Sequence, residues 1–150
     1  MIEIRSRLAV GGDDLPFDEI TALLGVLPTR QRRRHEFPVP GIGLDQWTYQ
    51  IEGMYPTPGP GHDPLKPFPN PEVTAQFDQI RHATGDRVQA FAGWRRDRSV
   101  EIWLSAAIQS EDDDPPTMAV SSDFVPFAAL MGAGLDFDIH TNAGPLAEAP

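Results

Sequence analysis

Residues 11–35, GGDDLPFDEITALLGVLPTRQRRRH, predict a short helix whose beginning and end are both marked in the sequence. Asp13 and Asp14 offer carboxylate oxygens to the N–H groups that are free at the start of a helix. Gly25 suits the left-handed position that ends a helix, and Pro28 prevents the helix from continuing. The apolar residues recur at the spacing of one helical face: Phe17, Ile20 and Leu24. These signals agree, and together they predict an amphipathic helix that ends before Gly25.

The same stretch ends in a dense group of basic residues, Arg30, Arg32, Arg33 and Arg34. Guanidinium groups bind phosphate and carboxylate through paired hydrogen bonds, so this group is a candidate anion-binding site. It is equally compatible with a solvated turn whose charges balance the acids of the same domain. No Gly-rich or periodic pattern accompanies the arginines, and both interpretations stay open.

Outside this stretch, apolar and polar residues alternate in several segments, which is the pattern of strands with one buried face. The predicted strands lie at about residues 2–10, 46–51, 88–94, 100–108 and 135–140, and helices are predicted at 71–84 and 124–131. Residues 95–99 join two of these strands as a hairpin turn. Trp103 faces away from the buried side of its strand, so its indole is expected to be partly exposed or covered by another element.

This order of elements, β-α-β-α-β-β-α-β, predicts an α+β fold with a mostly antiparallel sheet and helices packed on one face. We expect a single domain over residues 1–140, because 150 residues are enough for one core. Seven prolines predict a surface excursion at about residues 53–71, for which a linker between two domains is the alternative. Residues 141–150 are predicted to be a frayed tail.

The composition excludes several classes of protein. The chain has no cysteine, so disulfides, cysteine nucleophiles and zinc–thiolate sites are ruled out. No apolar run approaches the length of a membrane span and no signal peptide opens the chain, which predicts a cytoplasmic protein that does not bind membranes. The net charge of −10 disfavours nucleic acid as a partner.

The negative charge is concentrated in the C-terminal third of the chain. Residues 1–98 contain all 12 basic residues and 13 of the 22 acidic ones, so residues 99–150 contain nine acids and no Lys or Arg. Such a surface attracts a basic protein, and its densest part is the run Glu111, Asp112, Asp113 and Asp114. These four residues are the predicted partner-binding site. A charge that only keeps the protein soluble is the simpler alternative.

No pattern in the sequence predicts catalytic residues, a cofactor or a metal site. Asp136, Asp138 and His140 share one face of the last predicted strand, but alternate residues of a strand lie ~7 Å apart, too far to hold one ion together. Residues 11–13 are not part of a phosphate-binding loop, because the Lys-Ser/Thr ending is missing. The sequence therefore leaves enzymatic activity undecided and favours its absence.

Three segments resemble a family of small stand-alone bacterial proteins that is catalogued as a domain of unknown function. They are GDDLPFDEITALLGVLPTRQRRR, DQWTYQIE and GAGLDFDIH, which look like a Gly-Asp-x-Leu helix with a Pro-Thr turn, a Trp strand and a closing Leu-Asp-x-Asp-Ile strand. The resemblance spans nearly the whole chain apart from residues 53–71. It implies a fold and supplies no catalytic residues, and immunity proteins of toxin systems are the functional association that it suggests.

We therefore predict a non-enzymatic protein-binding module, in its most specific form an immunity-type inhibitor whose acidic C-terminal third engages a basic protein. The alternative is a small-molecule enzyme or ligand-binding domain that receives an anionic ligand at Arg30–Arg34. A third hypothesis is a module that oligomerises through an exposed aromatic sheet face. The sequence does not predict the oligomeric state itself.

Overall fold

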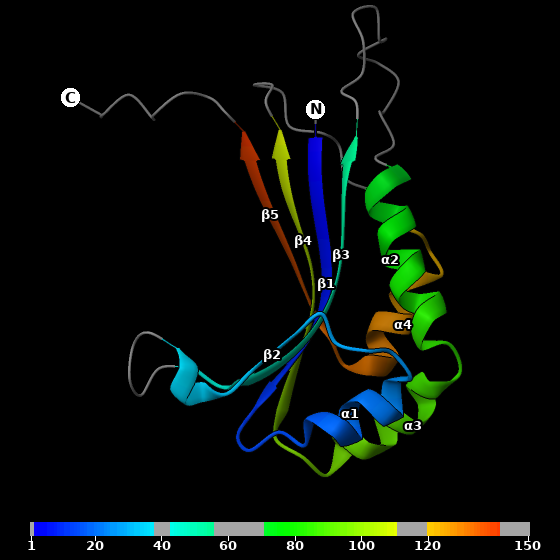
Figure 1. The fold of residues 1–150 in the computed structure, drawn as a ribbon. Helices are drawn as coiled ribbons and strands as arrows, with labels where there is room; N and C mark the ends of the chain where they lie inside the picture. The colour runs from blue at the N-terminus through cyan, green and yellow to red at the C-terminus, as the bar shows by residue number, and fades with distance from the viewer. Residues whose placement is uncertain (1, 38–42, 56–70, 111–119, 142–150) are drawn as a thin grey trace, which may run out of the picture.

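A five-stranded sheet carries its helices on one face in the computed structural model (Figure 1). The structure describes residues 2–37, 43–55, 71–110 and 120–141. Within these ranges the strands are β1 (Ile2–Gly12), β2 (Arg30–Arg32), β3 (Asp45–Tyr55), β4 (Val100–Ser110) and β5 (Gly134–Thr141). The helices are α1 (Phe17–Leu24), α2 (Pro71–Thr84), α3 (Arg87–Arg96) and α4 (Phe124–Met131), and a 3₁₀ turn, η1 (Arg34–Glu36), follows β2. The predicted α+β class is confirmed.

The N-terminal strand lies at the centre of the sheet, whose order is β2-β3-β1-β4-β5. β1 pairs antiparallel with β3 on one side and with β4 on the other, and β2 adds antiparallel to β3. β5 instead pairs parallel with β4. Parallel neighbours need a crossover connection, and α4 lies in that connection. The last pair is therefore a β-α-β unit at one edge of an otherwise antiparallel sheet.

Alternation along the strands separates a buried face from an open one. On β1, Ile4, Leu8 and Val10 are fully buried beneath the helices, whereas Arg5 and Arg7 are exposed. The buried residues of β4 are Ile102, Leu104, Ala106 and Ile108. The sheet face without helices, called the open face below, carries the partly exposed Trp103, as its position in the alternation predicts.

Aromatic side chains from several elements complete the core. Phe77 of α2 stacks on Phe124 of α4 with the ring centroids 4.5 Å apart, and Phe137 of β5 meets Phe77 edge-on at 6.1 Å. Trp47 of β3 is fully buried, and its indole N–H donates to Thr21 Oγ1 of α1 at 3.0 Å. Burial of large rings contributes strongly to packing the helices on the sheet.

The helix predicted from residues 11–35 is confirmed as α1, although its first turn is arranged differently. Gly25 takes the left-handed conformation expected at the helix end, with φ +71°. Pro16, rather than Asp13 or Asp14, directly precedes the helix, and no side chain caps it. Asp14 has a positive φ of 50° because it lies in the tight turn that leads out of β1.

The predicted order of elements is wrong in two places, of which residues 88–94 are the larger error. Instead of a strand they form most of α3, with these residues buried at helical spacing: Val88, Phe91 and Ala92. Gly85, with φ +51°, ends α2 and allows a new helix to begin almost at once. Residues 95–99 consequently join a helix to β4 and form no hairpin turn.

The second difference is β2, a three-residue strand inside the arginine group. Arg30 and Arg32 pair with Thr48 and Gln46 of β3, and the Thr29 N–H donates to the Thr48 carbonyl at 2.8 Å. A strand of this length has no periodicity of its own and forms because β3 offers it an edge. The observed order is therefore β-α-β-β-α-α-β-α-β.

Residues 53–55, predicted to begin the Pro-rich excursion, instead continue β3. Pro71 is the first residue of α2, as the predicted helix over 71–84 requires, and a missing N–H costs nothing there. Residues 56–70 and the predicted tail from 142 onward lie outside the described residues. Across the described ranges, no helix combines the length and the apolar character needed to cross a membrane.

Candidate functional site

The four arginines of the predicted anion site do not all point to one place. Arg30 and Arg32 are cross-strand partners of Thr48 and Gln46, and these residues lie on the open face of the sheet. Arg33 follows the strand, and its side chain points toward the start of α1, on the face of the sheet that the helices cover. Because successive residues of an extended chain point to opposite sides of a sheet, the four arginines do not share one surface, although they are close together in the sequence.

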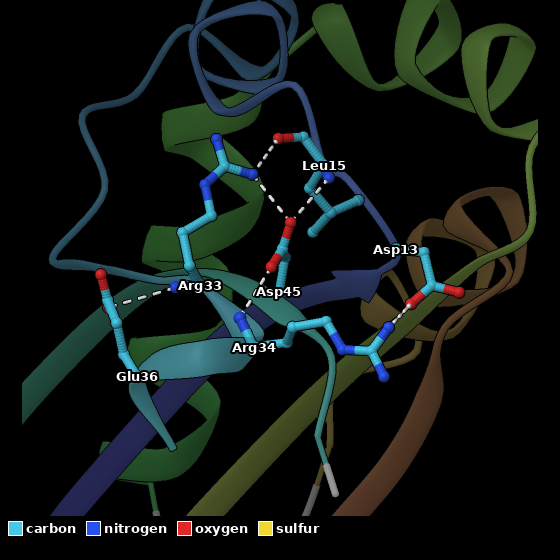
Figure 2. Close-up of polar contacts among 6 residues, drawn as sticks. All are labelled: Asp13, Leu15, Arg33, Arg34, Glu36 and Asp45. Atoms are coloured by element: carbon cyan, nitrogen blue, oxygen red, sulfur yellow. Dashed lines mark hydrogen bonds and ion pairs between the residues drawn. The ribbon is translucent and has the colours of Figure 1, made fainter. Parts of the chain in front are cut away.

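Arg33 is engaged in contacts within the chain, as Figure 2 shows. Its Nη1 donates to Asp45 Oδ2 at 2.7 Å and to the Leu15 carbonyl at 2.8 Å. Its guanidinium carbon lies 3.9 Å from the centroid of the Phe17 ring, a cation–π contact. Arg33 therefore links the start of α1 to β3, and these contacts compete with the binding of an external anion.

The other arginines of the group have weaker partners. Arg34 Nη1 lies 3.4 Å from Asp13 Oδ1, and both side chains are more than half exposed. The Arg32 guanidinium carbon lies 4.7 Å from the centroid of the Phe37 ring. Arg30 is exposed. Of the predicted anion-binding set, Arg30 and Arg32 are the two that share one surface, the open face.

A hollow beside Arg33 is open to solvent and is poorly suited to an anion. Its lining residues are Pro16, Phe17, Asp18, Glu19, Gln31 and Arg33. Two of them carry carboxylates, and the arginine is already paired with Asp45. The local field therefore opposes a negatively charged ligand.

Asp45 organises the turn that carries Arg33 and Arg34, called the arginine turn below, and no pattern in the sequence singles Asp45 out. Its side chain is almost fully buried, and besides Arg33 it accepts hydrogen bonds from the Leu15 N–H at 3.1 Å and the Arg34 N–H at 2.8 Å. Burial by itself favours the neutral acid, but the hydrogen bonds from Arg34, Arg33 and Leu15 outweigh it and lower the pKa of Asp45. One ionised carboxylate thus joins the loop before α1, the arginine turn and β3 (Figure 2).

Acid is expected to remove the stability that Asp45 contributes. Because its pKa is lower in the folded chain than in the unfolded chain, this contribution is complete above the unfolded value and is lost as pH falls through the folded value. We expect the urea midpoint of the wild type to fall as pH is lowered below about 4, the ordinary Asp value, and that of Asp45→Asn to fall less. Urea titrations followed by Trp fluorescence measure both. An equal fall in the two proteins would contradict a role for this charge.

A second surface lies on the open face of β4 and β5. Trp103 is 45% exposed and lies against Gly134 of the paired strand, where an added Cβ would come within 2.6 Å of the indole ring. Glu101 of β4 shares this face, as do Asp136 and Asp138 of β5, and all three carboxylates are exposed. We call these four residues the acidic Trp surface: Glu101, Trp103, Asp136 and Asp138.

His140 also lies on this face, and it is paired with one of the two aspartates. Its Nε2 is 2.8 Å from Asp138 Oδ2, and both side chains are well exposed. Asp136 takes no part in that contact. Within residues 2–37, 43–55, 71–110 and 120–141, no three His, Asp or Glu side chains gather as a metal ion would require.

The opposite face of β5 is apolar and incompletely covered by the helices. Three of its side chains are 44%, 37% and 42% exposed, respectively: Leu135, Phe137 and Ile139. Their partners on β4 are all buried: Leu104, Ala106 and Ile108. The helical layer therefore covers β4 fully and β5 only in part. The sequence predicts the alternation of β5 but not this exposure, which depends on its place at the edge of the sheet.

The predicted partner-binding residues Glu111, Asp112, Asp113 and Asp114 lie outside the described residues. They follow directly after Ser110, the last residue of β4. In the described part of the C-terminal third, the acidic residues are Glu101, Asp123, Asp136 and Asp138, and Arg98 is the last basic residue of the whole sequence. Of these four described acids, three lie on the sheet: Glu101, Asp136 and Asp138.

The segments that resemble a bacterial domain of unknown function correspond to α1 with the arginine turn, to β3 and to β5. That resemblance stays a prediction. Comparisons of this chain with protein-family models, with curated proteins and with solved structures found no match.

Proposed function

We propose that this protein is a non-enzymatic module that binds a basic protein through the acidic Trp surface. The observation that carries the proposal is Trp103, a large indole left 45% exposed on a sheet face where the neighbouring charged residues of β4 and β5 are carboxylates. In its most specific form the module is an immunity-type inhibitor that covers a basic surface of a toxin.

An exposed tryptophan on a rigid strand is well suited to anchor a partner. Tryptophan is enriched among the few residues that contribute most of the binding energy at protein interfaces. The ring of Trp103 already rests against Gly134, so little side-chain freedom remains to be lost when a partner covers it. The surrounding carboxylates add attraction for a cationic partner and raise its association rate.

The charge of the open face also favours one orientation of such a partner. On the half of the face away from β5, four arginines outnumber two carboxylates: Arg5, Arg7, Arg30 and Arg32 against Glu3 and Glu52. Asp136 and Asp138 lie at its other edge. A basic protein is repelled from the first half and attracted to the second, which directs it to the acidic Trp surface.

The alternative, a small-molecule enzyme or ligand-binding domain built on Arg30–Arg34, has less support. Arg33 is hydrogen-bonded to Asp45 on the helical side, while Arg30 and Arg32 lie on the open face. A convergent clamp for one small anion would need these side chains to approach the same point. No observation on the described residues favours this function over protein binding.

Selection of a phage-displayed random peptide library on the immobilised full chain tests the proposal. We expect enriched peptides to be rich in Lys and Arg and to bind more weakly as NaCl is raised to about 0.5 M. Trp103→Ala should weaken their binding about 10-fold or more, measured by fluorescence anisotropy.

Met54→Ala is the matched control, because Met54 is an exposed apolar residue on the same face, 57% exposed and placed on β3 beside Glu3. This variant should bind the selected peptides as the wild type does. Enriched peptides without net positive charge, or binding that survives Trp103→Ala unchanged, would refute the proposal.

A further inference from the structure

The outer edge of β5 is an open edge of the sheet, to which another chain can add a strand. β5 is the last strand of the sheet, and among the described residues no strand pairs with its far side. In a parallel pair, alternate residues direct their N–H and C=O groups to the neighbour, so the remaining residues of β5 direct theirs outward. Such a row of groups can pair with an extended segment.

β5 lacks most of the features that protect an edge strand. Protective edges are short, or carry charged side chains or Pro, or are bent by a bulge. On the other side of the sheet, β2 has three residues, of which two are arginines, and it covers only residues 46–48 of β3. β5 is eight residues long, GLDFDIHT, and contains no Pro. Its charged residues Asp136 and Asp138 repel an acidic strand but attract a cationic one.

The two faces of β5 define what an added strand should carry. Asp136 and Asp138 lie on the open face, where a neighbouring strand would place cationic side chains beside them. Phe137, between them in sequence, lies on the helical face and is 37% exposed, as are Leu135 and Ile139 to a similar extent. Apolar side chains of an added strand would cover this row.

We infer that β5 binds an extended segment of the basic partner as a sixth strand, in which Lys or Arg alternates with apolar residues. The inference rests on the proposed function and specifies how the partner is held. Backbone pairing supplies affinity, and the alternation of side chains supplies selectivity. The occupant is a segment of another protein.

A second copy of this chain fits the edge less well. Two β5 strands side by side would bring Asp136 and Asp138 near their own counterparts, and like charges on neighbouring strands are destabilising. β2 of a second copy offers Arg30 and Arg32 at the right spacing, but it has three residues and places Gln31 where an apolar side chain is needed. Charge and length therefore both favour a different protein.

Peptides of about seven residues test this inference on the full chain. One alternates Lys with Val, and a scrambled peptide of the same composition breaks the alternation. Two further peptides carry the alternating sequence with backbone N-methyl groups on its odd or on its even residues. Since only one set of N–H groups faces β5, one methylated peptide should lose binding and the other should keep it.

We expect the alternating peptide to bind at least about 10-fold more tightly than the scrambled one, measured by fluorescence anisotropy. In amide hydrogen exchange, outward-facing amides of β5 should exchange rapidly in the free protein and become protected by the alternating peptide. The double variant Asp136→Asn and Asp138→Asn should bind the alternating peptide about 10-fold more weakly than the wild type does.

Several outcomes would overturn the inference. Equal binding of the alternating and scrambled peptides would do so while leaving the proposed function intact, provided that Trp103→Ala still weakens both. Loss of binding with both methylated peptides, or with neither, would remove strand pairing as the cause. Protection of the outward amides in the free protein, or self-association through β5 seen by light scattering, would show that the edge is already occupied.

Discussion

Replacing Phe77 by alanine is expected to lower the free energy of unfolding by about 3–5 kcal/mol. The ring of Phe77 is 1% exposed, stacks on Phe124 at 4.5 Å and meets Phe137 edge-on. Truncation removes the transfer free energy of a whole ring and leaves a cavity between α2, α4 and β5. Urea denaturation followed by circular dichroism measures the change.

Phe137→Ala is the matched control for Phe77→Ala. It also removes a phenyl ring, and that ring is the one that meets Phe77 edge-on. Phe137 is 37% exposed, so part of its surface meets water in both the folded and the unfolded chain. We expect a loss of about 1 kcal/mol for this variant. Equal losses for the two variants would show that Phe77 is not at the centre of the core.

Replacing Asp45 by alanine is expected to lower the free energy of unfolding by about 2–4 kcal/mol at neutral pH. The change leaves the Leu15 and Arg34 N–H groups without the acceptor that the folded chain provides. The cost stays below that of a fully buried ion pair, because the Arg33 side chain is 39% exposed and can turn to water. Urea denaturation at pH 7 measures this loss.

Asp13→Ala provides the comparison for Asp45→Ala in the same arginine turn. Asp13 also pairs with an arginine, at 3.4 Å from Arg34, but its side chain is 70% exposed. An ion pair in such a setting contributes little, and we expect a change within about 0.5 kcal/mol. If the two variants lose similar stability, burial and the backbone hydrogen bonds of Asp45 are not what matters.

Strong local signals made much of the fold predictable. The residues of α1 form an apolar face at helical spacing, and Gly25 and Pro28 follow its end. Few structures other than a helix fit these signals together. The strands with one buried face are equally clear, because β1 alternates from Ile2 to Val10 and β4 alternates over its whole length. These signals depend on neighbours in sequence, and the structure confirms the elements that they predict.

The errors arose where a pattern fits two periods or depends on distant residues. In residues 88–94, Val88, Ala90 and Ala92 alternate as in a strand, while Val88 with Phe91 also fits a helical face. Only tertiary packing distinguishes the strand pattern from the helical pattern, and the residues that it buries are those at helical spacing. The strand β2 likewise exists through its pairing with β3 and has no local signature.

The candidate sites were harder to predict than the fold for the same physical reason. The arginine cluster separates because an extended chain alternates sides, which the sequence shows only once residues 30–32 are known to be a strand. The role of Asp45 depends on Leu15, Arg33 and Arg34, and Leu15 lies 30 residues away along the chain. The alternation correctly predicted that Trp103 faces away from the core, but it left open whether the indole is partly exposed or covered by another element.

The central position of β1 has a consequence for how the protein is made. Its two neighbours are β3 and β4, and roughly 90 residues separate the end of β1 from the start of β4. At ~5–20 residues per second, a ribosome needs roughly 5–20 s to cover that distance. The strand that emerges first therefore waits for one of its partners, with the apolar side chains of Ile4, Leu8 and Val10 incompletely covered. Newly made chains should depend on chaperones more than refolded ones of full length.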